Sequence, residues 1–196
     1  MDFNPFKRKI SELNTLEPQK GNLLVAEPFM QDFNFMRSVV LLVENNEDGA
    51  VGFILNKAEG MQVKDVIADF PDFDAPLYLG GPVETQSLFF LHTKGDLIND
   101  SVKIKDGLYW NGNLEQVKAM IEQKLVQPNE IKFFLGYAGW DKVQLEEELK
   151  LNSWLIKESS PEIIFNRGNE LWKEVIANSP KEISVMANFP LDPGMN

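Results

Sequence analysis

The order of apolar and polar positions along the chain predicts strands first. GNLLVAE (21–27) is an apolar run that stops at Pro28, which is typical of a short strand. RSVVLLVENNEDGAVGFILN (37–56) predicts a hairpin, because two β-rich runs flank turn-forming residues at 45–49. The unbroken apolar run 39–43 indicates a strand that lies in the centre of a sheet and is covered on both faces.

Two further stretches add strands. PLYLGGPVETQSLFFLHT (76–93) predicts two extended segments, divided by the flexible pair Gly80 and Gly81 and by Pro82, which cannot donate a backbone hydrogen bond. IKFFLGYAG (131–139) predicts another buried strand.

Helical periodicity is clearest in GNLEQVKAMIEQKLVQP (112–128). Asn113 can cap this helix, and an apolar stripe precedes Pro128, formed by Leu114, Val117, Ile121 and Leu125. MQVKDVIADF (61–70) fits a short helix, and NELWKEVIANSP (169–180) fits a last one with Asn169 as its cap. Because strands and helices follow no regular alternation, we predict an α+β fold with a mixed sheet.

The stretch FFLGYAGWDKVQLEEELK (133–150) predicts a joint between a strand and a helix. A strand that ends near Leu135 would be followed by bends at Gly136 and Gly139. Asp141 and Gln144 have the spacing of a capping box at the start of the helix.

The remaining side chains of this joint have simple interpretations. The acidic run 146–148 indicates a solvated helix face, and Trp140 and Trp154 are more typical of core anchors than of a ligand platform.

Composition limits the class of protein. The 196 residues, 43% hydrophobic and 25% charged, predict a single domain over 1–196 that begins with an N-terminal extension, 1–20. No stretch has the roughly 18 apolar residues of a membrane span, and the first residues lack the apolar core of a secretory signal. With no cysteine in the chain, we predict a cytoplasmic protein without a membrane partner.

A formal net charge of −11 argues against nucleic acid as a partner, because lysine and arginine supply most of the affinity for phosphates. The densest basic run is residues 7–9. The sequence contains neither a helix-turn-helix pattern nor a basic helix.

His92 is the only histidine and is the weak catalytic candidate. A hydrolase would pair it with a serine such as Ser87 and with an acid. However, the chain has no G-x-S-x-G motif, and strand alternation places Ser87 and His92 on opposite faces. A structural histidine is therefore the favoured interpretation, and a small hydrolase stays the alternative.

Metal and cofactor sites are not predicted. One histidine and no cysteine disfavour zinc, and the acidic residues show no spacing typical of a cation site. Phosphate-binding glycine motifs are absent from the sequence, so Gly80-Gly81-Pro82 and residues 49–52 are interpreted as turns that let two backbones pass closely.

The candidate binding residues are polar groups and aromatic rings on separate segments: Asn56, Gly81, Tyr137, Trp140 and Gln144. Asn56, at the end of GFILN, either closes a strand by bonding to backbone or joins Gly81, Tyr137 and Gln144 in a neutral polar pocket.

Several of these segments together resemble one family. GNLLVAEPFMQDFNFMRSVVLLVE, GAVGFILNK, YLGGPVETQSLFFLH and GYAGWDKVQLEEELKLNSWLI occur in the order found in the YqgE/AlgH family, whose members have no established biochemical activity. The resemblance runs from about Gly21 to Trp172.

The resemblance implies an α+β fold with a branching sheet, part of which curls into a small barrel surrounded by helices. Some members carry the label of transcriptional regulator, which fits the acidic charge only if they act through another protein. We therefore expect a non-enzymatic binding or regulatory module with a protein or small-molecule partner, and a hydrolase that uses His92 remains the alternative.

Overall fold

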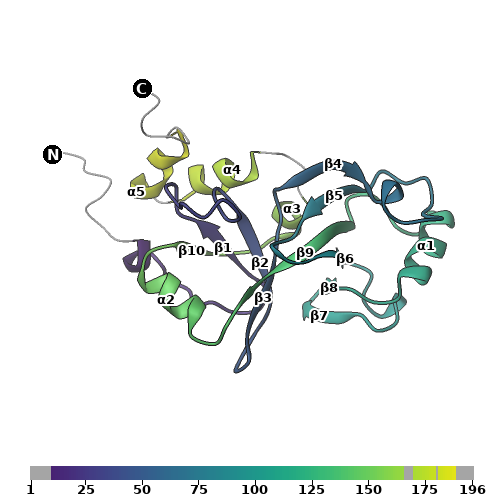
Figure 1. Cartoon of the computed structure of the whole chain (residues 1–196), viewed down its shortest axis with the longest axis horizontal. Helices are drawn as coiled ribbons and strands as arrows, with labels where there is room; N and C mark the ends of the chain where they lie inside the picture. The colour runs from purple at the N-terminus through teal and green to yellow at the C-terminus, as the bar shows by residue number, and fades with distance from the viewer. Residues whose placement is uncertain (1–9, 166–169, 180, 189–196) are drawn as a thin grey trace.

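The computed structural model describes residues 10–165, 170–179 and 181–188 (Figure 1). Asn169, the expected cap of the last predicted helix, lies outside these residues. The strands are β1 Asn22–Ala26, β2 Val39–Asn46, β3 Gly49–Ile54, β4 Ala58–Gln62, β5 Pro76–Leu79, β6 Val83–His92, β7 Val102–Lys105, β8 Leu108–Trp110, β9 Ile131–Trp140 and β10 Trp154–Glu158. The α-helices are α1 Leu114–Glu122, α2 Gln144–Lys150, α3 Pro161–Ile164, α4 Leu171–Ala177 and α5 Lys181–Ser184. Short 3₁₀ turns occupy Ile10–Glu12, Val63–Asp65, Gly95–Leu97 and Val185–Asn188.

The sheet branches at β9, which runs through the middle of the molecule (Figure 1). On one edge β9 pairs antiparallel with β3 through residues 138–140 and parallel with β5 through residues 133–135. Its other edge pairs with β6. The order β10-β1-β2-β3-β9-β6-β8-β7, with β4 and β5 as the branch, confirms an α+β protein with a mixed sheet.

Three glycines form the fork between the two branches. The Gly80 N–H donates to the Leu135 carbonyl oxygen of β9, and the Gly80 oxygen accepts from the Ile54 N–H of β3, each at 2.8 Å. Gly136 has a φ of +69° inside β9, and a Cβ there would lie 2.6 Å from the Gly81 oxygen. The predicted close passage of backbones at Gly80 and Gly81 therefore occurs, because a side chain would fill the fork.

The expected barrel is wrong, because the sheet does not close. The end strands β7 and β10 share no ladder. One side chain links their ends instead: the Lys105 ammonium at the end of β7 donates at 2.8 Å to the carbonyl oxygen of Ser159, which follows β10. The Ser159 hydroxyl donates to the oxygen of Gly21, just before β1, at 2.5 Å. The sheet curls enough for this bridge to form but remains open between its end strands.

The first half of the sheet, β10-β1-β2-β3, is covered on both faces. Residues 39–43 of β2 are fully buried. One face packs on α4 and α5, and the other packs on α2 and the rings of Trp140 and Trp154. This confirms the prediction of a central, doubly covered strand.

The second half of the molecule is built on β5, β6 and the start of β9. Helix α1 covers it with Val117, Met120 and Ile121, and the Asn113 side chain caps the helix by accepting from the Gln116 N–H at 3.0 Å. Leu125 lies beyond the helix and is 55% exposed, so the predicted apolar stripe is one residue too long.

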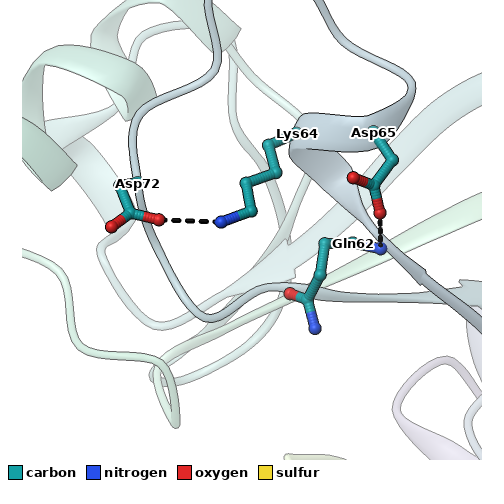
Figure 2. Close-up of polar contacts among 4 residues, drawn as sticks. All are labelled: Gln62, Lys64, Asp65 and Asp72. Carbon is teal, nitrogen blue, oxygen red and sulfur yellow. Dashed lines mark hydrogen bonds and ion pairs between the residues drawn. The ribbon is translucent and has the colours of Figure 1, made fainter.

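The short helix expected over 61–70 is only a 3₁₀ turn (Figure 2). The Asp65 carboxylate accepts from the Gln62 N–H at 2.8 Å and so holds the start of the turn. Lys64 forms an exposed ion pair with Asp72, also at 2.8 Å. Only Val63 of the turn is buried, which is too little apolar contact to support a longer helix.

Candidate functional site

The predicted joint between strand and helix contains a different arrangement of glycines. Strand β9 continues through Gly136 and Gly139 to Trp140, so these glycines lie within the strand and do not follow it. At Gly136 the positive φ lets β9 pass the fork, which keeps the strand continuous where local sequence suggested an end. The strand predicted over 131–139 is therefore confirmed, and the strand end expected near Leu135 is wrong.

The capping box at the start of α2 is only half formed. The Gln144 side chain accepts from the Asp141 N–H at 3.3 Å, but α2 begins after Val143 without a side-chain cap. Asp141 is exposed and offers its backbone oxygen, not its carboxylate, to the Gln144 N–H. Asp141 is therefore not the N-cap that the spacing predicted.

Glu148 organises the joint. Its Oε2 accepts the indole N–H of Trp140 at 2.9 Å and that of Trp154 at 2.7 Å, and its Oε1 accepts from the Gln144 amide at 2.9 Å. Both rings are buried, at 4% and 0% exposure, which confirms that they are core anchors. Phe35 packs against both, with ring centroids 5.7 and 5.5 Å away.

This role was missed when residues 146–148 were interpreted as one solvated face. The available signal was spacing: Glu148 lies four residues after Gln144 and therefore on the same side of the helix. The two indole partners, Trp140 and Trp154, are set by the sheet, which the helical period does not reveal.

A cavity of about 410 Å³ lies where the β2–β3 hairpin meets the end of β9; we call it the hairpin cavity. Pairing of Ala50 with Trp140 brings the hairpin to this position. The polar lining comes from Glu44, Asn46, Asp48, Tyr137, Asp141 and Gln144. Among the described residues, no lysine, arginine or histidine lines it, so the cavity is acidic.

The structure brings together three of the five candidate binding residues. Tyr137, Trp140 and Gln144 line the hairpin cavity. Gly81 is buried against the backbone of Tyr137 and forms part of the fork between the two branches of the sheet.

Asn56 lies elsewhere. Its carbonyl oxygen accepts from the Val39 N–H and its amide donates to the Arg37 oxygen, both at 2.9 Å, and it lines a separate cavity beside Trp172. Asn56 therefore closes a strand, and the neutral pocket that would have joined it to Gln144 does not form.

His92 is fully buried at the end of β6. Its Nδ1 accepts from the Lys94 N–H at 3.2 Å, so Nε2 carries the proton and donates to the Asn111 oxygen at 2.9 Å. The nearby hydroxyl is Ser101, not Ser87, and it gives its own proton to the Ile98 oxygen at 2.7 Å. Burial lowers the pKa of His92, which favours this neutral ring.

This hydrogen bonding leaves the ring without a free basic nitrogen. Neither ring nitrogen can take a proton from Ser101, because Nε2 is itself a donor toward that hydroxyl. The arrangement is that of a structural histidine.

The described residues contain no cluster of three or more His, Cys, Asp or Glu side chains arranged to hold a metal ion. None of their helices has the length and apolar character needed to cross a membrane.

The branched sheet with its open end strands is an AlgH-like architecture. It superimposes on the protein DIP2367 from Corynebacterium diphtheriae with a TM-score of 0.79 at 25% identity, covering 94% of this chain and all of that one. The solution structure of AlgH from Pseudomonas aeruginosa gives a TM-score of 0.70 at 30% identity, covering 90% of this chain and 98% of that one.

The chain belongs to the AlgH-like family, whose model matches residues 23–184. A UPF0301 protein of Chlorobium phaeobacteroides is 40% identical over 179 residues, which cover 91% of this chain and 96% of that protein. Another, from Cytophaga hutchinsonii, is 41% identical and covers 90% of this chain and 98% of its own length. These findings confirm the resemblance drawn from the sequence motifs.

Proposed function

We propose that this AlgH-like protein is a non-enzymatic binding module of the cytoplasm. Its site is the hairpin cavity, and its partner is a protein that presents lysine or arginine side chains. The observation that carries the proposal is the meeting of Tyr137, Trp140 and Gln144 with three carboxylates, Glu44, Asp48 and Asp141, in one cavity.

The charge of the site favours a basic partner. Carboxylates on one wall attract cations and raise the rate of encounter with a basic surface. Tyr137 adds an aromatic ring with a polar tip, a side chain that is enriched in protein interfaces. The acidic charge disfavours duplex DNA, so any regulatory role is exerted through the protein partner.

The hydrolase alternative is not favoured. Nε2 of His92 faces Ser101 as a donor, and His92 itself is shielded from solvent. Hydrolysis would require a base that accepts a proton from its nucleophile.

A capture experiment tests the proposal. The wild-type protein, the cavity variant Glu44→Gln/Asp48→Asn and the control variant Glu59→Gln/Glu122→Gln are immobilised and exposed to lysate of the native host. Glu59 and Glu122 are exposed and lie outside the hairpin cavity, so the control loses the same two charges. Captured proteins are quantified by mass spectrometry at low and high salt.

We expect a salt-sensitive partner that the wild type and the control retain and the cavity variant loses by at least tenfold. A set of captured proteins that is identical for all three would refute the proposal. Sub-micromolar, salt-dependent binding to random duplex DNA in an anisotropy assay would also contradict it.

A further inference from the structure

A second cavity, of about 470 Å³, lies between the loop 27–35 and the Glu148 side of α2; we call it the loop cavity. None of its lining residues lines the hairpin cavity. Its volume falls within the range of roughly 300–1,000 Å³ that is typical of small-molecule sites.

The walls of the loop cavity combine aromatic rings with carboxylates. Phe29 and Phe35 supply the rings, Trp154 lies fully buried against Phe35, and Met30 adds a polarisable thioether. Glu27, Asp32 and Glu148 supply the carboxylates. Among the described residues that line it, none is a lysine, arginine or histidine.

Two of these carboxylates, Glu27 and Glu148, have no cationic partner in the described part of the chain. The donors to Glu148 are two indoles and an amide, all neutral. Glu27 accepts one backbone N–H, that of Phe29, at 2.9 Å, and burial raises the pKa of its carboxyl. Asp32 differs, because its charge acts on the nearby ammonium group of Lys57.

The loop that forms one wall is held in place. Lys57 donates to the Phe33 oxygen at 3.0 Å and to the Asn34 oxygen at 2.6 Å. Asp32 accepts the Asn34 N–H through its side chain and the N–H of Met36 through its backbone oxygen. The cavity is therefore formed before a ligand arrives, which lowers the entropic cost of binding.

We propose that the loop cavity binds an organic ammonium cation. Aromatic rings attract such cations through their negative faces, and nearby carboxylates replace part of the lost hydration. An anion would meet only like charge from the side chains of the walls, and an uncharged apolar ligand would leave Glu27 and Glu148 desolvated without compensation. The loop cavity and the hairpin cavity share no lining residue, and Glu148 of the loop cavity bonds to Trp140 and Gln144 of the hairpin cavity.

Isothermal titration calorimetry with matched probes tests the proposal. Choline is compared with 3,3-dimethylbutan-1-ol, which has the same shape without the charge. Nα-acetyl-lysine methylamide is a third probe and distinguishes a lysine side chain of a partner protein from a free small cation. Each is titrated into the wild type, Glu27→Gln, Phe29→Leu and the control Glu122→Gln.

We expect at least one of the two cations to bind the wild type at least tenfold more tightly than the neutral isostere. Glu27→Gln should weaken that cation at least tenfold and Phe29→Leu severalfold, while Glu122→Gln leaves it unchanged. The amide oxygen that Glu27→Gln introduces can still accept the Phe29 N–H, so the loop should keep its fold. If neither cation binds more tightly than the neutral isostere, or neither binds at all, the proposal is overturned.

Discussion

Gly136→Ala is the sharpest test of the branched sheet. The residue has a φ of +69°, a conformation that costs an alanine about 1–2 kcal/mol. The added Cβ would also lie 2.6 Å from the Gly81 oxygen and 2.7 Å from the Val83 oxygen, both of which are backbone atoms of the fork. Forcing such a contact into a packed region adds about 1–3 kcal/mol, so the expected total is about 2–5 kcal/mol.

Gly107→Ala is the matched control, because it separates the two contributions. Gly107 has nearly the same φ, +73°, but an added Cβ there has no atom of the described residues within 4 Å. This variant should therefore lose only the conformational part, about 1–2 kcal/mol. Urea denaturation followed by circular dichroism measures both free energies of unfolding. A difference below about 0.5 kcal/mol between the two variants would refute the close packing of the fork.

Three further predictions concern individual side chains. Glu148→Ala should lower the free energy of unfolding by about 2–5 kcal/mol, because it leaves two buried indole N–H groups without an acceptor. The control Glu147→Ala on the same helix should change it by less than about 0.5 kcal/mol, and equal effects of the two variants in urea denaturation would exclude the role given to Glu148. Asp141→Ala should change the free energy of unfolding by less than about 0.5 kcal/mol in the same assay, since the Asp141 carboxylate does not cap α2; a loss near 1 kcal/mol would show that it does act as the predicted cap. Burial holds the folded pKa of His92 below its unfolded value of about 6.5, so the neutral ring contributes its full share to the free energy of unfolding above that pH, and this share is lost as the pH falls through the folded pKa. His92→Gln should flatten this part of the curve of stability against pH, and an unchanged curve would argue against the neutral ring.

Local signals in the sequence predicted much of the fold. Helix α1 was found because its cap and apolar stripe lie within one segment, and β2 because its apolar run is unbroken. The apolar run 131–139 predicted almost all of β9, whereas the strand end expected near Leu135 was wrong, because a glycine within a strand resembles a bend unless the opposing backbone is known. β10 was missed because it has only five residues and follows directly after a helix.

The candidate site shows the same division. Tyr137, Trp140 and Gln144 could be predicted as neighbours because they lie within eight residues of one another. The acidic character of their cavity could not be predicted, because Glu44 and Asp48 are brought to the cavity only by the pairing of β3 with β9. Asn56 was placed with them on polarity alone, and its hydrogen bonds to Val39 and Arg37 hold it at another edge.

The position of β1 between β2 and β10 has a consequence for synthesis. β1 is translated early, from residue 22, but one of its edges stays unpaired until β10, which ends at residue 158, has been translated. Until then a nascent chain presents an unpaired apolar strand, NLLVA, of the kind that recruits other strands and promotes aggregation. Most of the polypeptide must therefore leave the ribosome before this edge is covered, a longer delay than in a fold whose strands pair locally.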